Sequence, residues 1–193
     1  MEFRARMSAA IAAVLICPIL LGASPTPAPG GATQRAAVEG CLNQWLFDGI
    51  WRFRVTNVEP INPDGLRPGY GVAVEFRNGT RTTLTPTFSG ADAQGIQLQL
   101  DDGNTLDSKA TTAAALIAQK ITYKELIQAA GVTVELQFLG DTMAKPDSLK
   151  KPLKLVFPID PKPERAHPAL PQYAAGDPSF RVDLTCDAKA KAP

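Results

Sequence analysis

Two stretches of alternating residues decide the fold of this chain: Ile50-Trp-Arg-Phe-Arg-Val-Thr-Asn-Val58 and Tyr70-Gly-Val-Ala-Val-Glu-Phe76. In the first, Trp51, Phe53 and Val55 share one face, while arginine and threonine side chains share the other. In the second, every other residue is a large apolar one. A period of two residues is typical of a β-strand, whose successive side chains point to opposite faces of a sheet. The pattern therefore predicts two strands that each bury one face.

The rest of the chain carries further strand signals. In the Thr-rich stretch of residues 81–88, Pro86 marks an edge or a bulge, because proline cannot donate a hydrogen bond to a neighbouring strand. About seven strands are typical of an antiparallel sandwich. We therefore expect a mainly β chain, folded as an antiparallel β-sandwich with one or two short helices. The strands beyond the first two are predicted at residues 81–88, 95–100, 132–138, 153–157 and 180–186.

Turn signals separate these strands. Asn62-Pro-Asp-Gly65 has the composition of a tight turn. Asn78-Gly79 predicts a two-residue hairpin turn. Together with Thr80 it also matches the acceptor motif for N-linked glycosylation, but turn chemistry explains the motif fully.

Three stretches are candidates for helix. Residues 111–120 are Ala-rich. Thr122-Tyr-Lys-Glu125 has the spacing of a capping box, which predicts a short helix over residues 123–130. Residues 42–47 are compatible with one or two helical turns that pack Trp45 or Leu46 inward.

The first residues have the composition of an export signal. Arg4 and Arg6 precede an apolar run over residues 9–21, and small residues follow it. Such a series is typical of a secretory signal peptide, and the apolar run is too short to span a bilayer as a helix. We therefore expect a signal peptide over residues 1–23, with an uncleaved anchor as the alternative.

The expected domain organisation follows from composition. Residues 24–36 are rich in Pro, Gly and Ala and predict a tether. Residues 37–187 predict the β-sandwich domain, and residues 188–193 a disordered tail. The export signal predicts a secreted or periplasmic protein without a membrane span after cleavage.

Charge and composition exclude several classes of protein. The 193 residues include 20 Lys and Arg against 19 Asp and Glu, and 45% are hydrophobic, which is too apolar and too evenly charged for a disordered protein. Cleavage of the predicted signal removes two basic residues and one acidic residue, so the mature chain has a formal charge of zero. We therefore expect no nucleic-acid partner.

Cys41 and Cys186 lie at the two ends of the patterned region. In an oxidising compartment such a pair most often forms a disulfide, so we predict a Cys41–Cys186 bond that holds the first element beside the last. A redox-active or metal-binding pair is the alternative, but neither a CxxC spacing nor neighbouring histidines support it.

The sequence contains no recognisable catalytic set. The single histidine, His167, lies next to Pro168 in a proline-rich stretch, and no Gly-x-Ser-x-Gly motif is present. Acidic residues such as Glu75, Glu135 and Asp183 fall on polar strand faces, where a solvated role is expected. We therefore expect that the chain is not an enzyme.

Asp101-Asp-Gly-Asn-Thr-Leu-Asp107 is the best candidate for a cation site. Carboxylate and amide oxygens on a turn suit a hard ion such as calcium, so Asp101, Asp102, Asn104 and Asp107 are candidate ligands. A complete helix-flanked loop with a final bidentate Glu is missing, and a polar turn with Gly favours the same residues. No other cofactor is expected.

Trp45 and Tyr70 are candidate ligand-binding residues. Exposed aromatic rings that lie together can form a platform for a carbohydrate or a peptide. Trp45 is also close enough in sequence to Cys41 to shield the predicted disulfide.

The middle of the chain resembles a bacterial extracytoplasmic immunoglobulin-like domain. The likeness is carried by Val72-Ala-Val-Glu-Phe-Arg-Asn-Gly-Thr80, Thr82-Thr-Leu-Thr-Pro-Thr87, Ile96-Gln-Leu-Gln-Leu-Asp-Asp-Gly103 and Pro152-Leu-Lys-Leu-Val-Phe-Pro158. In such domains an apolar strand ends in an Asn-Gly turn and a more polar strand follows. The resemblance implies an immunoglobulin-like sandwich with a role in adhesion or binding, and it offers no catalytic residues.

Together these features predict a secreted or periplasmic, non-catalytic binding or structural module whose partner is a protein or glycan of the cell envelope. A carbohydrate-binding module is one alternative and predicts exposed coplanar aromatic rings. An accessory subunit of an envelope complex or a hydrolase is the other. It predicts an exposed apolar patch or a pocket with two carboxylates.

Overall fold

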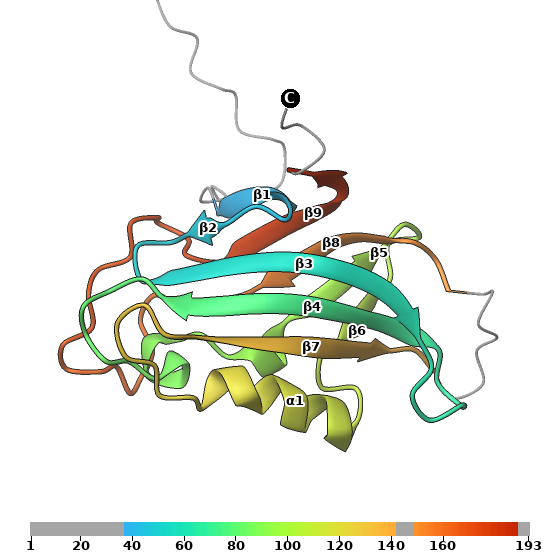
Figure 1. Cartoon of the computed structure of the whole chain (residues 1–193), viewed down its shortest axis with the longest axis horizontal. Coiled ribbons are helices and arrows are strands. Elements are labelled where there is room, and N and C mark those ends of the chain that lie inside the picture. Colours follow the sequence, from blue (N-terminus) through green and yellow to red (C-terminus); the bar gives the residue numbers. More distant parts are fainter. Residues whose placement is uncertain (1–36, 142–148, 189–193) are drawn as a thin grey trace, which may run out of the picture. The chain divides into compact units, whose positions relative to one another are not determined.

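The computed structural model describes residues 37–141 and 149–188. These residues form two β-sheets that pack face to face, one α-helix and two short 3-10 helices (Figure 1). The prediction of a mainly β, antiparallel sandwich is confirmed, apart from one pair of strands that runs parallel. The predicted signal peptide, the tether and residues 189–193 of the tail lie outside the described residues. In the described part of the chain, no helix is long and apolar enough to cross a membrane.

Two sheets make up the sandwich. The four-stranded sheet runs in the order β2 (Leu46–Phe47), β3 (Trp51–Ile61), β4 (Gly69–Asn78) and β7 (Gly131–Leu139). The five-stranded sheet runs in the order β1 (Val38–Leu42), β9 (Phe180–Asp187), β8 (Pro152–Phe157), β5 (Gln97–Leu100) and β6 (Thr105–Asp107). The connections contain η1 (Pro86–Ser89), η2 (Ala93–Gly95) and α1 (Thr112–Thr122).

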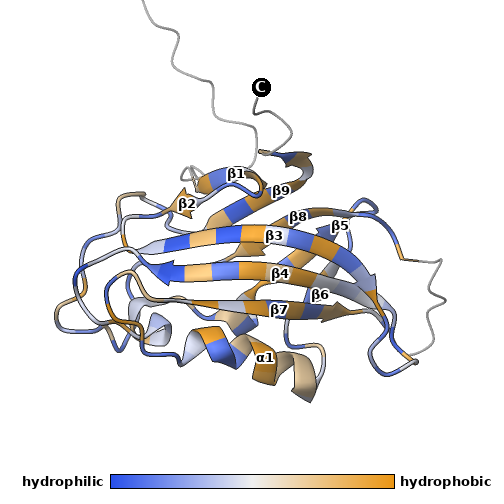
Figure 2. Cartoon of the chain, viewed as in Figure 1, coloured by the Kyte–Doolittle hydropathy of each residue, from blue (hydrophilic) through white to orange (hydrophobic). Residues whose placement is uncertain are grey.

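Strands β3 and β4 are the two stretches that decided the predicted fold. They pair antiparallel from Trp51 opposite Asn78 to Ile61 opposite Gly69, and the predicted turn at residues 62–65 connects them. The alternation of hydrophilic and hydrophobic residues along both strands is visible in Figure 2. One face of each strand is buried as predicted, because an alternating strand can place all its apolar side chains on one side.

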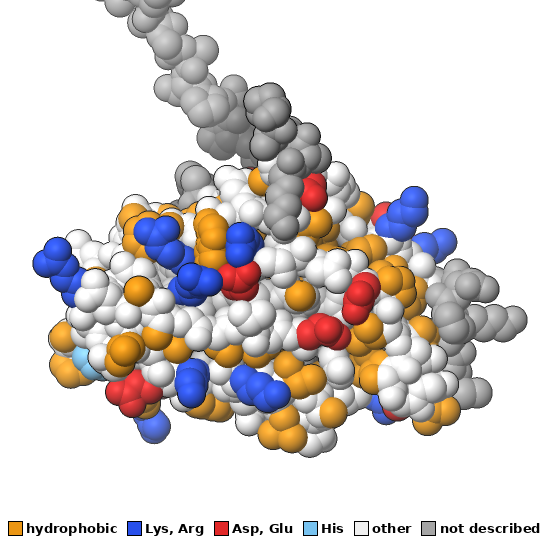
Figure 3. Space-filling view, viewed as in Figure 1, with side chains coloured by type: hydrophobic (Ala, Val, Ile, Leu, Met, Phe, Trp, Pro, Cys, Tyr) orange, Lys and Arg blue, Asp and Glu red, His pale blue; other side chains and the backbone are white. Residues whose placement is uncertain are grey.

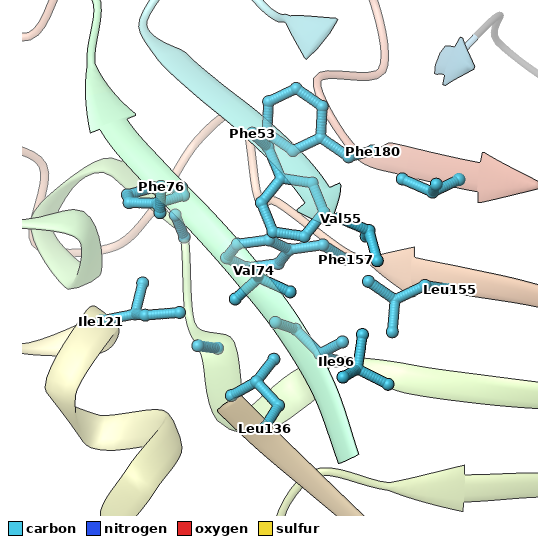
Figure 4. Packing of buried hydrophobic residues seen from close by; sticks show 14 of the residues in the cluster. Phe53, Val55, Val74, Phe76, Ile96, Ile121, Leu136, Leu155, Phe157 and Phe180 are labelled. Carbon is cyan, nitrogen blue, oxygen red and sulfur yellow. The ribbon is translucent and has the colours of Figure 1, made fainter. Parts of the chain in front are cut away.

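The core fills the space between the two sheets (Figure 4). Phe53 of the four-stranded sheet contacts Phe157 and Phe180 of the other, with ring centroids 5.5 and 5.3 Å apart. Trp51 stacks on Phe76 at 4.7 Å. All five rings are fully buried, so aromatic packing joins the layers.

The predicted disulfide between Cys41 and Cys186 is confirmed. It joins β1 to β9, which pair in parallel, so the first strand lies beside the last as expected. Disulfides are typical of oxidising, extracytoplasmic compartments.

The predicted hairpin at Asn78-Gly79 is wrong. Strand β4 pairs with β3 and β7 and not with the segment that follows it. The Asn78 side chain is buried, and its Nδ2 donates to the carbonyls of Thr82 and Leu126 at 2.7 and 2.8 Å. The chain therefore turns away from the sheet, and the buried amide is not accessible for glycosylation.

The predicted strand over residues 81–88 is also wrong. Apart from a bridge between Leu84 and Leu126, this segment does not pair, and Pro86 begins the 3-10 helix η1. Proline suits the first turn of a helix because its fixed φ is helical and the missing N–H would have no partner there.

The helix expected over residues 123–130 is absent, and the real helix is α1, which covers the Ala-rich stretch. Thr122 does not cap a new helix, because it is the last residue of α1. Its buried Oγ1 donates to Asp92 Oδ1 and accepts from the Ala93 N–H. The helical turns expected over residues 42–47 are likewise absent: a turn at Asn43 separates β1 from β2.

Candidate functional site

The outer face of the four-stranded sheet carries a cluster of arginines. Because the inward positions of β3 and β4 are apolar, the intervening Arg52, Arg54, Glu75 and Arg77 point outward. The strand register places Arg54 opposite Glu75 and Arg52 opposite Arg77. Figure 3 shows basic side chains gathered around hydrophobic ones over β2, β3 and β4.

The pairing of Arg52 with Arg77 is unfavourable for the fold itself. Like charges directly opposite each other on neighbouring strands repel and destabilise a sheet. Glu75 contacts Arg54 at 2.5 Å and Arg77 at 3.1 Å, but within the described residues no carboxylate forms an ion pair with Arg52. Three guanidinium groups and one carboxylate leave a local charge of two positive units on a chain that is nearly neutral.

Trp45 covers this cluster, and its position follows from the sequence around it. Leu46 is buried at the edge of the core, so its neighbours Trp45 and Phe47 must point to the other side. Asn43 makes the preceding turn with a φ of 65°, and its N–H donates to the Val55 carbonyl at 2.8 Å. This bond fixes the turn against β3, so that the tryptophan lies over the arginines.

Aromatic rings and guanidinium groups are paired throughout the cluster. The guanidinium carbons of Arg54 and Arg77 lie 4.5 and 5.0 Å from the centre of the Trp45 ring. The guanidinium of Arg52 lies 4.9 Å from the centre of the Phe47 ring. Such cation–π contacts hold the cations in place without neutralising them.

A hollow of about 360 Å³ opens beside this cluster. Part of its lining comes from two segments far apart in sequence: residues 79–80, which follow β4, and residues 128–129, which precede β7. Its wall presents guanidinium, indole, hydroxyl and amide groups. The hollow is lined by Trp45, Arg52, Arg77, Asn78, Gly79, Thr80, Gln128 and Ala129.

The structure separates the two aromatic residues that the sequence proposed as a platform. Trp45 lines the hollow, but Tyr70 is only 8% exposed, and its hydroxyl donates to the Lys150 carbonyl at 2.9 Å. Tyr70 points into the core from the opposite end of β4. Trp45 and Tyr70 therefore do not form a common exposed platform, because the alternation that makes β4 a strand turns the Tyr70 side chain inward. Ligand binding by Tyr70 stays a prediction.

The candidate cation ligands lie around the β5–β6 turn. Asp102 accepts hydrogen bonds from the backbone N–H and the side-chain amide of Asn104, and Asp107 accepts one from Gln97 at 3.4 Å. Asp101 is exposed at the start of the turn. Among the described residues, three or more metal-ligating His, Cys, Asp or Glu side chains do not come together anywhere. Calcium binding at this turn stays a prediction.

The arginine cluster is the part of the site that the sequence did not single out. The alternation of β3 predicts that Arg52 and Arg54 face outward, but their partners come from β4 and from the turn before β2. The available signal was the repeated Arg on the polar face of both strands, where Arg52, Arg54 and Arg77 flank a single outward carboxylate, that of Glu75.

Asp48 is a second feature that the sequence did not reveal. Its side chain is fully buried, and Oδ1 accepts the backbone N–H groups of Ile50 and Trp51, both at 2.7 Å. Burial raises the pKa of this carboxyl to about 7, although the two N–H groups favour the charged form. Tyr173 lies nearby and donates to the Ser89 carbonyl, and burial raises its pKa as well. The carboxyl of Asp48 has no exposed surface, and its two hydrogen bonds hold the turn that starts β3.

We predict that Asp48 makes the stability of the fold depend on pH. The pKa is raised from 3.8 to about 7 on folding, so the contribution of this proton to stability is full below pH 3.8, declines above it and is lost as pH rises through 7. The free energy of unfolding should fall by about 3 kcal/mol between pH 5 and pH 8. Asp48→Asn keeps an acceptor for both N–H groups and should remove this decline.

Urea unfolding followed by circular dichroism at several pH values checks this prediction. The difference between the wild type and Asp48→Asn isolates the contribution of this residue. Asp64 and Asp183, whose pKa values hydrogen bonds hold below the usual range, act at lower pH and do not disturb the comparison. Parallel pH profiles for the two proteins would contradict the assignment.

Comparisons with known proteins identify no family. No family model matches the chain, and no curated protein matches it. The solved structure of the yjhA protein from Bacillus subtilis is similar with a TM-score of 0.46 and 14% identity, over 75% of this chain and 99% of that one. An uncharacterized β-sandwich protein from Clostridium difficile 630 has a TM-score of 0.42 and 11% identity, over 80% and 98%. Likenesses of this size carry no argument about function.

Proposed function

We propose that this chain is a non-catalytic binding module of an extracytoplasmic compartment and that it binds an anionic ligand in the hollow beside Trp45. The observation that carries the proposal is the like-charged pair of Arg52 and Arg77 on facing strands. An exposed arginine pair without enough carboxylates to neutralise it weakens the sheet. A ligand oxyanion that bridges the two guanidinium groups would offset their repulsion. Arginine binds carboxylate and phosphate groups in a planar, bidentate manner, which suits such a ligand.

The chemistry of the hollow favours binding over catalysis. Arginine stays protonated at physiological pH and cannot serve as a general base. Glu75 forms ion pairs with both Arg54 and Arg77, which occupy its two carboxylate oxygens. Trp45 adds a flat apolar surface beside the charges, which suits a ligand with an anionic group attached to a ring.

The compartment is proposed from two features. The disulfide between Cys41 and Cys186 is typical of an oxidising environment, and the first residues have the composition of a secretory signal peptide. The immunoglobulin-like resemblance agrees with a binding role and belongs to this proposal. A glycan or a protein of the cell envelope is the expected source of the ligand.

Binding of dextran sulfate, with uncharged dextran for comparison, tests the anion site. We expect dextran sulfate to bind and dextran not to bind, with an affinity that falls as the salt concentration rises. Arg52→Gln and Arg77→Gln should each weaken binding about 10-fold, which corresponds to the loss of one charge-assisted contact. Isothermal titration calorimetry measures the affinity, and the tryptophan fluorescence provides a second signal.

A control of equal charge separates a specific site from general attraction. The double variant Arg67→Gln with Lys109→Gln changes the net charge by the same amount as Arg52→Gln with Arg77→Gln, but at exposed or half-buried positions that do not line the hollow. It should bind almost as well as the wild type. Equal losses in the two double variants, or no loss in either, would overturn the proposal.

A further inference from the structure

A second hollow lies close to the arginine hollow. The two are separated by the chain segments that pair at Leu84 and Leu126, which we call the ridge. The volume of the second hollow is about 530 Å³, and two exposed aromatic rings, Phe88 and Tyr123, line it. Phe88 is 45% exposed and Tyr123 is 59% exposed, unlike the aromatic rings of the core. Thr85, Thr87, Glu125 and Arg165 complete the lining, so this hollow combines flat apolar rings with hydroxyl groups and with one charge of each sign.

The ridge between the two hollows is short and rigid. Glu125 lines the second hollow and Gln128 the first, and three residues of chain span at most about 11 Å. Leu84 and Leu126 exchange backbone hydrogen bonds of 3.0 and 2.9 Å across the ridge. The buried Asn78 amide donates to a carbonyl on each of the ridge's two segments, those of Thr82 and Leu126. The relative position of the two hollows is therefore fixed by the fold.

We propose that the anionic ligand is a linear glycan that crosses this ridge, with an acidic sugar in the arginine hollow and a neutral sugar between Phe88 and Tyr123. This inference rests on the proposed anion site and names the class of ligand that it takes. The charges differ between the hollows: Arg52 and Arg77 leave the first positive, whereas Glu125 and Arg165 balance in the second. A chain in which acidic and neutral sugars alternate matches both.

The shape and chemistry of the surface favour a glycan over an acidic peptide. A peptide that binds as an added strand pairs its backbone with an exposed strand edge. The arginine hollow instead lies on the face of the sheet, over the central strands β3 and β4. Sugar rings present a flat apolar face and a rim of hydroxyl groups, which suit aromatic side chains beside Thr80, Gln128, Thr85 and Thr87.

Hyaluronan oligosaccharides, in which glucuronate alternates with N-acetylglucosamine, are the probe. We expect the hexasaccharide to bind more tightly than glucuronate alone, because a single acidic sugar occupies only the arginine hollow. Tyr123→Ala should weaken hexasaccharide binding about 10-fold and leave glucuronate binding unchanged. Arg77→Gln should weaken both. Leu66→Ala, which truncates an exposed apolar side chain in the β3–β4 turn, is the matched control and should change neither.

Phe88→Ala gives a second test of the same hollow and should act like Tyr123→Ala. An affinity that does not depend on length, or a hexasaccharide affinity that neither aromatic variant changes, would overturn the glycan proposal. The same holds if polyglutamate binds as tightly as the hexasaccharide. If dextran sulfate binds through Arg52 and Arg77 while hyaluronan does not bind, the anion site stands and the glycan inference fails. If neither polyanion binds, both fail.

Discussion

Replacing Cys41 and Cys186 together with serine is expected to lower the free energy of unfolding by roughly 5 kcal/mol. The bond closes a loop with a sequence separation of 145 residues, and closing a long loop removes much of the conformational entropy of the unfolded chain. Typical stabilities of whole domains are about 5–15 kcal/mol, so a loss of this size leaves a fold that is marginal at physiological temperature.

Urea unfolding of the double serine variant, compared with the wild type before and after reduction, measures this effect. The reduced wild type should unfold at the same urea concentration as the variant, because both lack the same covalent constraint. The slope of the transition should also rise in the variant, since its unfolded state exposes more surface. A loss of less than 1 kcal/mol would show that the bond contributes little beyond the pairing of β1 with β9.

Phe53→Ala is expected to destabilise the sandwich by about 3–5 kcal/mol. The ring is fully buried and lies between Phe157 and Phe180 of the opposite sheet. Removing the ring loses the free energy gained by burying it away from water, and it leaves a cavity between the two sheets. Those sheets cannot close the cavity without losing their own strand pairing. Contacts between aromatic rings add to the loss.

Thermal and urea unfolding of Phe53→Ala, with Leu66→Ala as the control, check this prediction. Leu66 is 63% exposed, so its truncation should change the stability by no more than about 0.5 kcal/mol. Similar effects of the two substitutions would contradict the position of Phe53 at the centre of the core.

The sequence predicted the parts of the fold that local periodicity controls. The buried faces of β3 and β4 and the pairing of Cys41 with Cys186 were readable because alternation and cysteine count need no knowledge of distant neighbours. The helix expected over residues 123–130 failed for the opposite reason. Thr122 has the spacing of a cap, but its hydroxyl is taken by Asp92, thirty residues earlier in the chain.

The arginine site could not be predicted from the sequence, because a bulge sets the register of the two strands. If the pairing of β3 with β4 continued from the turn at residues 62–65 without a shift, Arg52 would lie opposite Asn78. The register shifts between Val55 and Asn57, and this irregularity brings Arg52 opposite Arg77. The contact with Trp45 depends in turn on a hydrogen bond from Asn43 to β3. Neither the register shift nor this hydrogen bond produces a periodic pattern in the sequence.

The disulfide also determines how the domain transmits mechanical tension. A force applied between a residue before Cys41 and a residue after Cys186 passes directly through the covalent bond. The residues between them, which include both hollows, carry none of it, so a ligand bound there would experience an undistorted surface while the chain is pulled. Reduction would place the whole loop in the path of the load and allow an extension of roughly 500 Å on unfolding.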